Sequence, residues 1–259
     1  MSQLERLLHI MERLRDPERG CPWDREQDWA SIAPHTIEEA YELADAIARA
    51  DVDAVRDELG DVLFQVVFQA RIAQERALFD FERVAATIAD KLERRHPHVF
   101  ADARVDDAAA QTHAWEQHKR AERAQRGQGG ALDGVTLGLP ALTRAAKLGS
   151  RAARVGFDWP DAPGVIEKVQ EEVAELQREL AGGTPERIRE EVGDLLFALV
   201  QAARHLEVDA EAALREANGK FERRFRHVEA LLARDGLAPT DVDMQRLDAL
   251  WDVAKRELG

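Results

Sequence analysis

Ten acidic residues form one pattern that occurs twice in the chain. Each copy has a Glu-Glu-x-x-Glu motif, followed after fifteen residues by a Glu-x-x-Asp motif, and every member of the first copy recurs 133 positions later. The copies are Glu38, Glu39, Glu42, Glu58 and Asp61, and then Glu171, Glu172, Glu175, Glu191 and Asp194. Scattered surface charge does not keep such register. Carboxylate oxygens gathered in this way are typical ligands of a hard divalent cation.

Helical geometry predicts that the carboxylates of each copy converge. At about 100° per residue, Glu172 and Glu175 lie some 60° apart, at the edge of an apolar stripe that includes Val173. Glu191 and Asp194 lie in the same way on the next helical segment. If the two apolar stripes pack together, four carboxylates meet at the rim, and such like charges need a cation between them. One acidic motif alone would more simply be a solvated helix face, but its exact repetition argues against that.

The ligand type limits the choice of cation. Carboxylate oxygens suit Mg²⁺, with Mn²⁺ possible, and do not suit Zn²⁺. A di-iron carboxylate site would need two Glu-x-x-His pairs. The chain has Glu93 with His96, but the repeated position pairs Glu222 with Phe225. Magnesium held by carboxylates keeps open positions, so it can bridge phosphate oxygens and activate a water, which predicts chemistry on a phosphate ester.

Basic and aromatic side chains could bind the phosphates and the rest of such a substrate. Lys220 and Arg224 share one helical face, and Trp251 and Lys255 are also four residues apart. Ordinary salt bridges and packing are the alternatives for these two pairs. The predicted substrate-binding residues are Lys168, Lys220, Arg223, Arg224, Trp251 and Lys255.

The elements that position these residues are predicted to be helices. Apolar residues recur with helical spacing over 37–48, 59–67, 166–180 and 192–203, and no segment alternates like a strand. We therefore expect an all-α protein.

Helix-breaking segments divide the chain and indicate a duplication. Breakers occupy 16–22 and 182–185, and five glycines and a proline lie between Gly127 and Pro140. We expect two tandem helical-bundle domains, 1–126 and 140–259, joined by a Gly-rich linker at 127–139. The repeat extends beyond the acidic residues: the Gly60 to Arg71 segment matches Gly193 to Arg204, Lys91-x-x-Arg94-Arg95 matches Lys220-x-x-Arg223-Arg224, and Trp115-x-x-x-Lys119-Arg120 matches Trp251-x-x-x-Lys255-Arg256.

Composition excludes several classes of protein. The formal net charge of -14 argues against a general nucleic-acid binder, which needs a basic face. The first fourteen residues lack the apolar run of a signal peptide, and no stretch is apolar enough to predict a membrane span. Cys21 is the single cysteine, so an intramolecular disulfide framework and a cysteine zinc cage are excluded. A cytoplasmic location is therefore expected.

Further motifs carry a resemblance to a known family. They are Cys21-Pro22-Trp23-Asp24, Glu38-Glu39-x-x-Glu42, Glu58-x-Gly60-Asp61, Arg94-Arg95-His96-Pro97-His98-Val99-Phe100, Arg151-Ala152-Ala153-Arg154-Val155-Gly156-Phe157-Asp158-Trp159 and Lys220-Phe221-x-Arg223-Arg224-Phe225. In this order, over nearly the whole chain, they closely resemble the tandem-domain MazG nucleoside triphosphate pyrophosphohydrolases. The doubled carboxylate motif alone would fit the wider all-α pyrophosphatase group, which includes dimeric dUTPases and dCTPases.

The resemblance implies hydrolysis of nucleoside triphosphates between the α and β phosphates, for housecleaning of the nucleotide pool, by a homodimer. It implies that Glu172, Glu175, Glu191 and Asp194 hold the metal, and that Glu171 orients or deprotonates the water. The equivalent ligands in the first copy are Glu39, Glu42, Glu58 and Asp61.

One difference between the copies favours the second as the main catalyst. Ala198 and Ala202 follow Asp194 on its helical face, and the matching residues of the first copy are Gln65 and Gln69. Alanines leave room for substrate beside the metal, whereas glutamines fill it. Two alternatives stay open from the sequence: a non-catalytic helical adaptor or regulatory protein, and a pyrophosphatase specific for one pyrimidine nucleotide.

Overall fold

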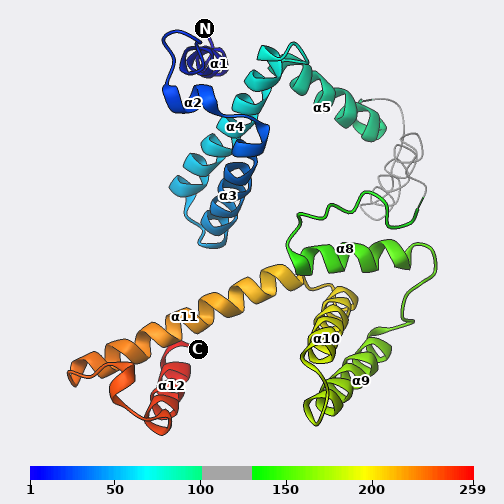
Figure 1. Cartoon of the computed structure of the whole chain (residues 1–259), viewed down its shortest axis with the longest axis vertical. Helices are drawn as coiled ribbons and strands as arrows, with labels where there is room; N and C mark the ends of the chain where they lie inside the picture. Colours follow the sequence, from blue (N-terminus) through cyan, green and yellow to red (C-terminus); the bar gives the residue numbers. More distant parts are fainter. Residues whose placement is uncertain (101–129) are drawn as a thin grey trace. The chain divides into compact units, whose positions relative to one another are not determined.

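The computed structural model describes residues 1–100 and 130–259, and all regular structure in these ranges is helical (Figure 1). The all-α prediction is therefore confirmed. The described residues form two compact units, one on each side of residues 101–129, and each unit is considered by itself. The predicted linker begins outside the described residues, and its part from 130 to 139 consists of turns and irregular backbone.

The first unit contains six described helices, labelled as in Figure 1. They are α1 (Gln3–Leu14), α2 (Pro22–Glu26), α3 (Trp29–Ala48), α4 (Val52–Glu75), α5 (Phe81–Arg95) and α6 (Pro97–Phe100). The second unit repeats the long central pair. Its described elements are α8 (Ala141–Ala153), α9 (Ala162–Leu180), α10 (Pro185–His205), α11 (Ala210–Arg234), the short 3₁₀ helix η1 (Pro239–Asp241) and α12 (Met244–Leu258).

A hairpin of two long helices is the centre of each unit. Helix α3 packs along α4, and α9 packs along α10, as Figure 1 shows. Each helix of these two hairpins begins with a side-chain oxygen that accepts a hydrogen bond from a backbone N–H. The Asp28 side chain accepts from the backbone N–H of Ser31 at 2.9 Å at the start of α3, and the Thr184 side chain accepts from that of Arg187 at 3.4 Å at the start of α10. Among the described helices none is long and apolar enough to span a membrane.

The turn between α9 and α10 requires glycine at one position. A Cβ on Gly183 would lie 2.1 Å from a carboxylate oxygen of Glu179 and 2.8 Å from its carbonyl oxygen. The second contact is with backbone, which cannot move aside. The predicted break at 182–185 thus has a steric cause, and it sets the position at which α10 returns along α9.

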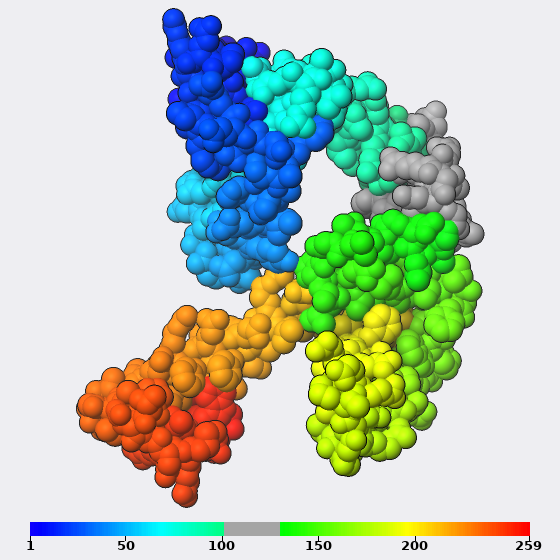
Figure 2. Space-filling model, in the orientation of Figure 1, coloured from blue at the N-terminus to red at the C-terminus, as the bar shows by residue number. Residues whose placement is uncertain are grey.

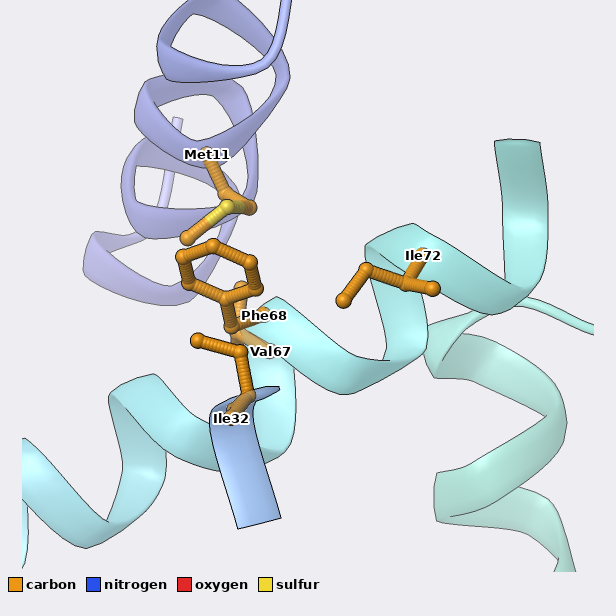
Figure 3. Close-up of a cluster of buried hydrophobic side chains, with 5 residues drawn as sticks. All are labelled: Met11, Ile32, Val67, Phe68 and Ile72. Carbon is orange, nitrogen blue, oxygen red and sulfur yellow. The ribbon is translucent and has the colours of Figure 1, made fainter. Parts of the chain in front are cut away.

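The core of the first unit lies where α1 and α3 meet α4. Met11, Ile32, Val67, Phe68 and Ile72 are almost completely buried and form one cluster (Figure 3). This cluster fixes the N-terminal part of α3 against the C-terminal half of α4. The acidic residues lie further along the same two helices, so the core determines how the helices face one another at those residues.

In the second unit a polar contact holds α8 against α10. Gln201 has no exposed surface, and its Nε2 donates to the carbonyl oxygen of Ala145 at 3.0 Å. A Cβ on Gly149 of α8 would lie 1.7 Å from Gln201 Oε1, so the glycine allows this close approach. Arg204 donates from Nε to the same oxygen of Gln201 and from its terminal nitrogens to Asp158. Helix α11 carries a separate cluster with α12, formed by Val228, Leu232, Leu250 and Ala254.

The structure corrects one expectation about packing. Apolar stripes were expected to be buried with the carboxylates at their rim, but Val192, Leu196 and Leu199 of α10 are 41%, 49% and 46% exposed, whereas Glu172 and Glu191 are buried. A two-helix hairpin buries only the strip where its helices touch, and in α9 and α10 that strip includes carboxylates. Val192, Leu196 and Leu199 are therefore left outside this strip. The pair α9 and α10 forms the yellow-green to yellow part of Figure 2.

Candidate metal centre

Three carboxylates of the second unit lie together between α9 and α10. Glu172, Glu175 and Glu191 each offer an oxygen, and these oxygens all lie within 4.8 Å of one another. Glu172 is 5% exposed and Glu191 is 6% exposed. Like charges so close and so shielded from water need compensation, as the sequence analysis predicted for this copy.

Asp194, the fourth predicted ligand, is exposed and does not belong to this close group. It nevertheless lies near enough to act on Glu191. Burial is the main cause of the raised pKa of the Glu191 carboxyl; the charge of Glu175 raises it next, and Glu172 and Asp194 contribute less. The structure thus brings together three of the four predicted ligands and leaves the fourth beside them.

One carboxylate oxygen of Glu172 is suited to coordinate a metal ion. Its Oε2 is buried and forms no hydrogen bond with any described residue, although the side chain is almost wholly enclosed. A buried carboxylate oxygen without a partner is costly in free energy. All donors in the group are carboxylate oxygens, so the residues fit a hard cation such as Mg²⁺ or Mn²⁺.

Lys168 supplies positive charge inside this cluster. Its Nζ lies 2.9 Å from Glu171 Oε1 and 2.8 Å from Glu172 Oε1. Hydrogen bonds to Glu172 and then to Glu171 raise the pKa of the Lys168 ammonium well above its usual value. The predicted substrate-binding residue Lys168 therefore lies against the metal-ligand candidates themselves. Glu171, the candidate for orienting the water, is an exposed partner of this lysine.

Arg187 is a second cation at the cluster, with a side chain that is 54% exposed, and it was not predicted from the sequence. Its guanidinium lies 3.4 Å from Glu191 Oε1 and 2.7 Å from Glu190 Oε2. The signal was present, because Arg187 and Glu191 have the i, i+4 spacing of a helical ion pair. The two copies of the repeat also differ at this position, because the residue of the first copy that matches Arg187 is Ala54.

The first unit has a similar carboxylate group between α3 and α4. Oxygens of Glu39, Glu58 and Asp61 lie within 4.8 Å of one another, while Glu42 is exposed and outside this set. Burial raises the pKa of both Glu39 and Glu58; the next cause is the charge of Asp61 for Glu39 and the charge of Glu42 for Glu58. Glu58 Oε2 is buried and has no hydrogen-bond partner within the described ranges.

The remaining predicted substrate-binding residues lie on α11 and α12. Lys220, Arg223 and Arg224 belong to α11, and Trp251 and Lys255 belong to α12. Trp251 packs against Phe221, with ring centroids 5.2 Å apart, and Lys255 forms an ion pair with Asp252 at 2.6 Å. In the part of the chain that the structure covers, no hydrogen bond or ion pair joins these five residues to the carboxylates. Their role stays a prediction.

Comparison with known proteins agrees with the duplicated carboxylate site. The profile of the MazG nucleotide pyrophosphohydrolase domain matches residues 27–100 and again residues 164–229. The chain is 54% identical over 259 residues to the nucleoside triphosphate pyrophosphohydrolase of Escherichia coli strain K12, covering 99% of this chain and 98% of that protein. It is 44% identical over 251 residues to the nucleoside triphosphate pyrophosphohydrolase/pyrophosphatase MazG of Thermotoga maritima, covering 97% and 95% of the two chains.

Both domain matches contain the complete acidic pattern, so the sequence motif and the clusters of the structure fall in the same two regions. The chain belongs to the MazG nucleotide pyrophosphohydrolase family, a family of enzymes that hydrolyse phosphoric anhydrides, and it carries the family's domain twice.

Proposed function

We propose that this protein is a Mg²⁺-dependent nucleoside triphosphate pyrophosphohydrolase that releases a nucleoside monophosphate and pyrophosphate, with a role in housecleaning of the nucleotide pool. The observation that carries this proposal is the buried, partnerless oxygen of Glu172 within a group of three converging carboxylates. The printed names of the Escherichia coli and Thermotoga maritima relatives support the choice of substrate and products.

The residues of the second unit have distinct parts in this reaction. Glu172, Glu175 and Glu191, with Asp194 beside them, would hold the divalent ion. When bound, the ion supplies a Lewis acid that polarises phosphate oxygens and lowers the pKa of a coordinated water. Glu171 stands next to this group and can orient the water or accept its proton.

The anhydride bond between the α and β phosphates breaks as the water oxygen bonds to phosphorus, and pyrophosphate leaves with the bridging oxygen. Negative charge on the leaving pyrophosphate needs cations, which Lys168 can supply at the cluster. Lys220, Arg223, Arg224 and Lys255 are proposed to bind phosphates as well, and Trp251 offers an aromatic face to the nucleoside.

The direct test is product identity. Purified protein is incubated with a panel of ribo- and deoxyribonucleoside triphosphates with Mg²⁺, with Mn²⁺ and with a chelator, and pyrophosphate and orthophosphate are measured separately. We expect pyrophosphate in both metal-containing series and none with the chelator. Orthophosphate as the first product would refute α–β cleavage. No hydrolysis of any triphosphate under any condition would favour the non-catalytic helical adaptor. Hydrolysis of a single pyrimidine nucleotide would favour the pyrimidine-specific pyrophosphatase.

We further propose that the second unit is the main catalyst. Ala198 and Ala202, which are 3% and 5% exposed, follow Asp194 on its helical face, and Lys168 lies against Glu172, where it can meet phosphate. The first unit has Gln65 and Gln69 in place of the alanines. Small side chains leave space beside the ion, so the second unit is better suited to accept a triphosphate.

A second copy of this chain is proposed to cover the exposed apolar face of the hairpins. Leu59, Leu63 and Val66 of α4 are exposed, and the repeat-related residues of α10, described above, are exposed too. Aliphatic residues at such density seldom face water in a stable monomer. Leu196→Glu is expected to shift the protein to monomer in sedimentation analysis. A wild-type chain that is monomeric at micromolar concentration would contradict the homodimer.

A further inference from the structure

The carboxylate group of the first unit continues into a buried glutamine. On α4, Gln65 follows Asp61 by four residues and Glu58 by seven, which places it about 40° and 20° away from them around the helix axis. Helical side chains lean toward the N-terminus of their helix, so Gln65 leans back toward the turn that carries Asp61. All three side chains therefore share the face of α4 that meets α3.

Gln65 is enclosed and its amide oxygen is unused. The residue is 5% exposed, and Oε1 is buried with no hydrogen-bond partner among the described residues. A buried amide oxygen without a donor costs free energy, so its position demands an explanation. The next glutamine along this face, Gln69, does have a partner, because its Nε2 donates to Thr36 Oγ1 of α3 at 2.8 Å.

The two carboxylate groups differ in the cations that lie against them. In the second unit Lys168 lies against Glu172, and Arg187 lies against Glu191. The matching positions of the first unit hold His35 and Ala54. Within residues 1–100 and 130–259, no ion pair reaches Glu39, Glu58 or Asp61. Two acceptor oxygens, on Glu58 and Gln65, lie buried there without a donor.

We propose that the first unit binds a resident divalent cation in the absence of nucleotide, and that Gln65 Oε1 supports it by accepting a hydrogen bond from one of its waters. Magnesium-like ions keep waters when bound by a few carboxylates, and an acceptor behind such a water is a common means of holding it. The inference rests on the proposed role of these carboxylates as metal ligands.

This arrangement assigns different tasks to the two units. In the first, no ion pair between described residues holds Glu39, Glu58 or Asp61, and a glutamine stands at the position of Ala198 in the second. Glu39 of α3 and Glu58 of α4 would both hold the ion, which would then link the two helices of this hairpin. In the second unit an ion must compete with Lys168 and Arg187, which favours binding together with a polyphosphate that engages those cations.

The test measures metal binding without turnover. The full chain carrying Glu172→Gln and Glu191→Gln removes the second group, and Mn²⁺ is titrated without nucleotide while free Mn²⁺ is followed by electron paramagnetic resonance. We expect one bound Mn²⁺ per chain. Adding Gln65→Ala should weaken this binding about tenfold. Adding Gln65→Glu, which retains an acceptor oxygen, should keep the affinity at least as high as in the parent. Gln69→Ala is the matched control and should change the affinity by less than about twofold.

Specific outcomes would overturn the proposal. Either no bound Mn²⁺ in the Glu172→Gln, Glu191→Gln parent or an unchanged affinity after Gln65→Ala does so. If Gln65→Ala does not fold, the Gln65→Glu variant and the effect of Mn²⁺ on the melting temperature of the parent decide instead, and a melting temperature insensitive to Mn²⁺ contradicts the resident ion. Pyrophosphate release by the unaltered chain tests the proposed enzymatic function, whereas Mn²⁺ binding by the Glu172→Gln, Glu191→Gln parent tests this site, so the two can fail separately.

Discussion

Replacement of Lys168 by alanine should move two binding constants in opposite directions. Without nucleotide, the Lys168 ammonium lies 2.8 Å from Glu172 Oε1 and 2.9 Å from Glu171 Oε1, where it competes with any cation for these oxygens. With nucleotide, the same ammonium is free to meet phosphate. Lys168→Ala should therefore strengthen binding of a bare divalent ion by the second unit and weaken binding of the nucleoside triphosphate.

The size of the effect follows from the burial of the pair. Two unit charges about 4 Å apart attract by roughly 4 kcal/mol at an effective dielectric constant of about 20. The Glu172 side chain is 7% exposed and that of Lys168 is 33% exposed, so solvent and the cost of ordering the lysine remove much of this energy. A net interaction free energy of about 1.4 kcal/mol between Lys168 and Glu172 is reasonable for such a pair. A metal ion must overcome this free energy to bind, which corresponds to about a tenfold change in the metal dissociation constant.

The assay is titration with Mn²⁺ in protein whose first-unit group has been removed by Glu39→Gln and Glu58→Gln, together with KM for a nucleoside triphosphate at saturating metal. Lys147→Ala is the matched control, because Lys147 is an exposed lysine of α8 and its loss changes the net charge equally. We expect Lys168→Ala to bind Mn²⁺ about tenfold more tightly and to raise KM, and Lys147→Ala to change both by less than about twofold. Weaker Mn²⁺ binding by Lys168→Ala would refute the competition and show that the lysine holds the carboxylates in place.

Three further changes test other parts of the structure. Ala198→Gln, which gives the second unit the glutamine of the first, should lower kcat for pyrophosphate release at least about tenfold because the substituted site is only 3% exposed, and unchanged kcat would remove steric exclusion as the difference between the units. Gly149→Ala places a Cβ 1.7 Å from Gln201 Oε1 and should lower the free energy of unfolding by about 1–3 kcal/mol in denaturant titration; a neutral effect would mean that Gln201 moves aside freely. Hydrogen bonds from Arg204 and His205, together with the charge of Arg204, lower the pKa of Asp158 from 3.8 to about 2. The stability that these contacts add is therefore present above about pH 4 and is lost as the pH falls toward 2. Asp158→Asn should remove this acid dependence of unfolding, and an unaltered pH profile would contradict the ion pair.

The sequence was sufficient for the helices and for the place of both carboxylate groups. Helical spacing predicted the helices of both hairpins, and the break at 182–185 predicted the turn between α9 and α10, because apolar periodicity and glycine or proline act locally. The acidic motifs also predicted which helices carry the candidate ligands. The angular position of a residue around its helix axis shows which face of the helix it occupies. This placed Glu172 and Glu191 on the faces along which their two helices pack, and their carboxylate oxygens do lie close together.

Other features depend on contacts that spacing does not determine. Asp194 shares a helical face with Glu191, yet it is exposed and lies outside the close group. The position of a residue around the helix axis determines neither its side-chain rotamer nor how deeply it is buried between two helices. Which apolar side a hairpin buries depends on its partners, so the exposure of Leu196 was not predicted. The ion pair of Arg187 with Glu191 was not predicted, because i, i+4 spacing permits an ion pair without determining that the two side chains meet.

The measurement that tests the central claim most directly compares Glu175→Ala with Glu42→Ala, the repeat-related carboxylates of the two units. Both proteins and the unaltered chain receive the same nucleoside triphosphate with Mg²⁺, and pyrophosphate is quantified. We predict that Glu175→Ala abolishes pyrophosphate release, while Glu42→Ala retains most of it. A larger loss from Glu42→Ala, or undiminished release by Glu175→Ala, would contradict the assignment of catalysis to the carboxylates of the second unit.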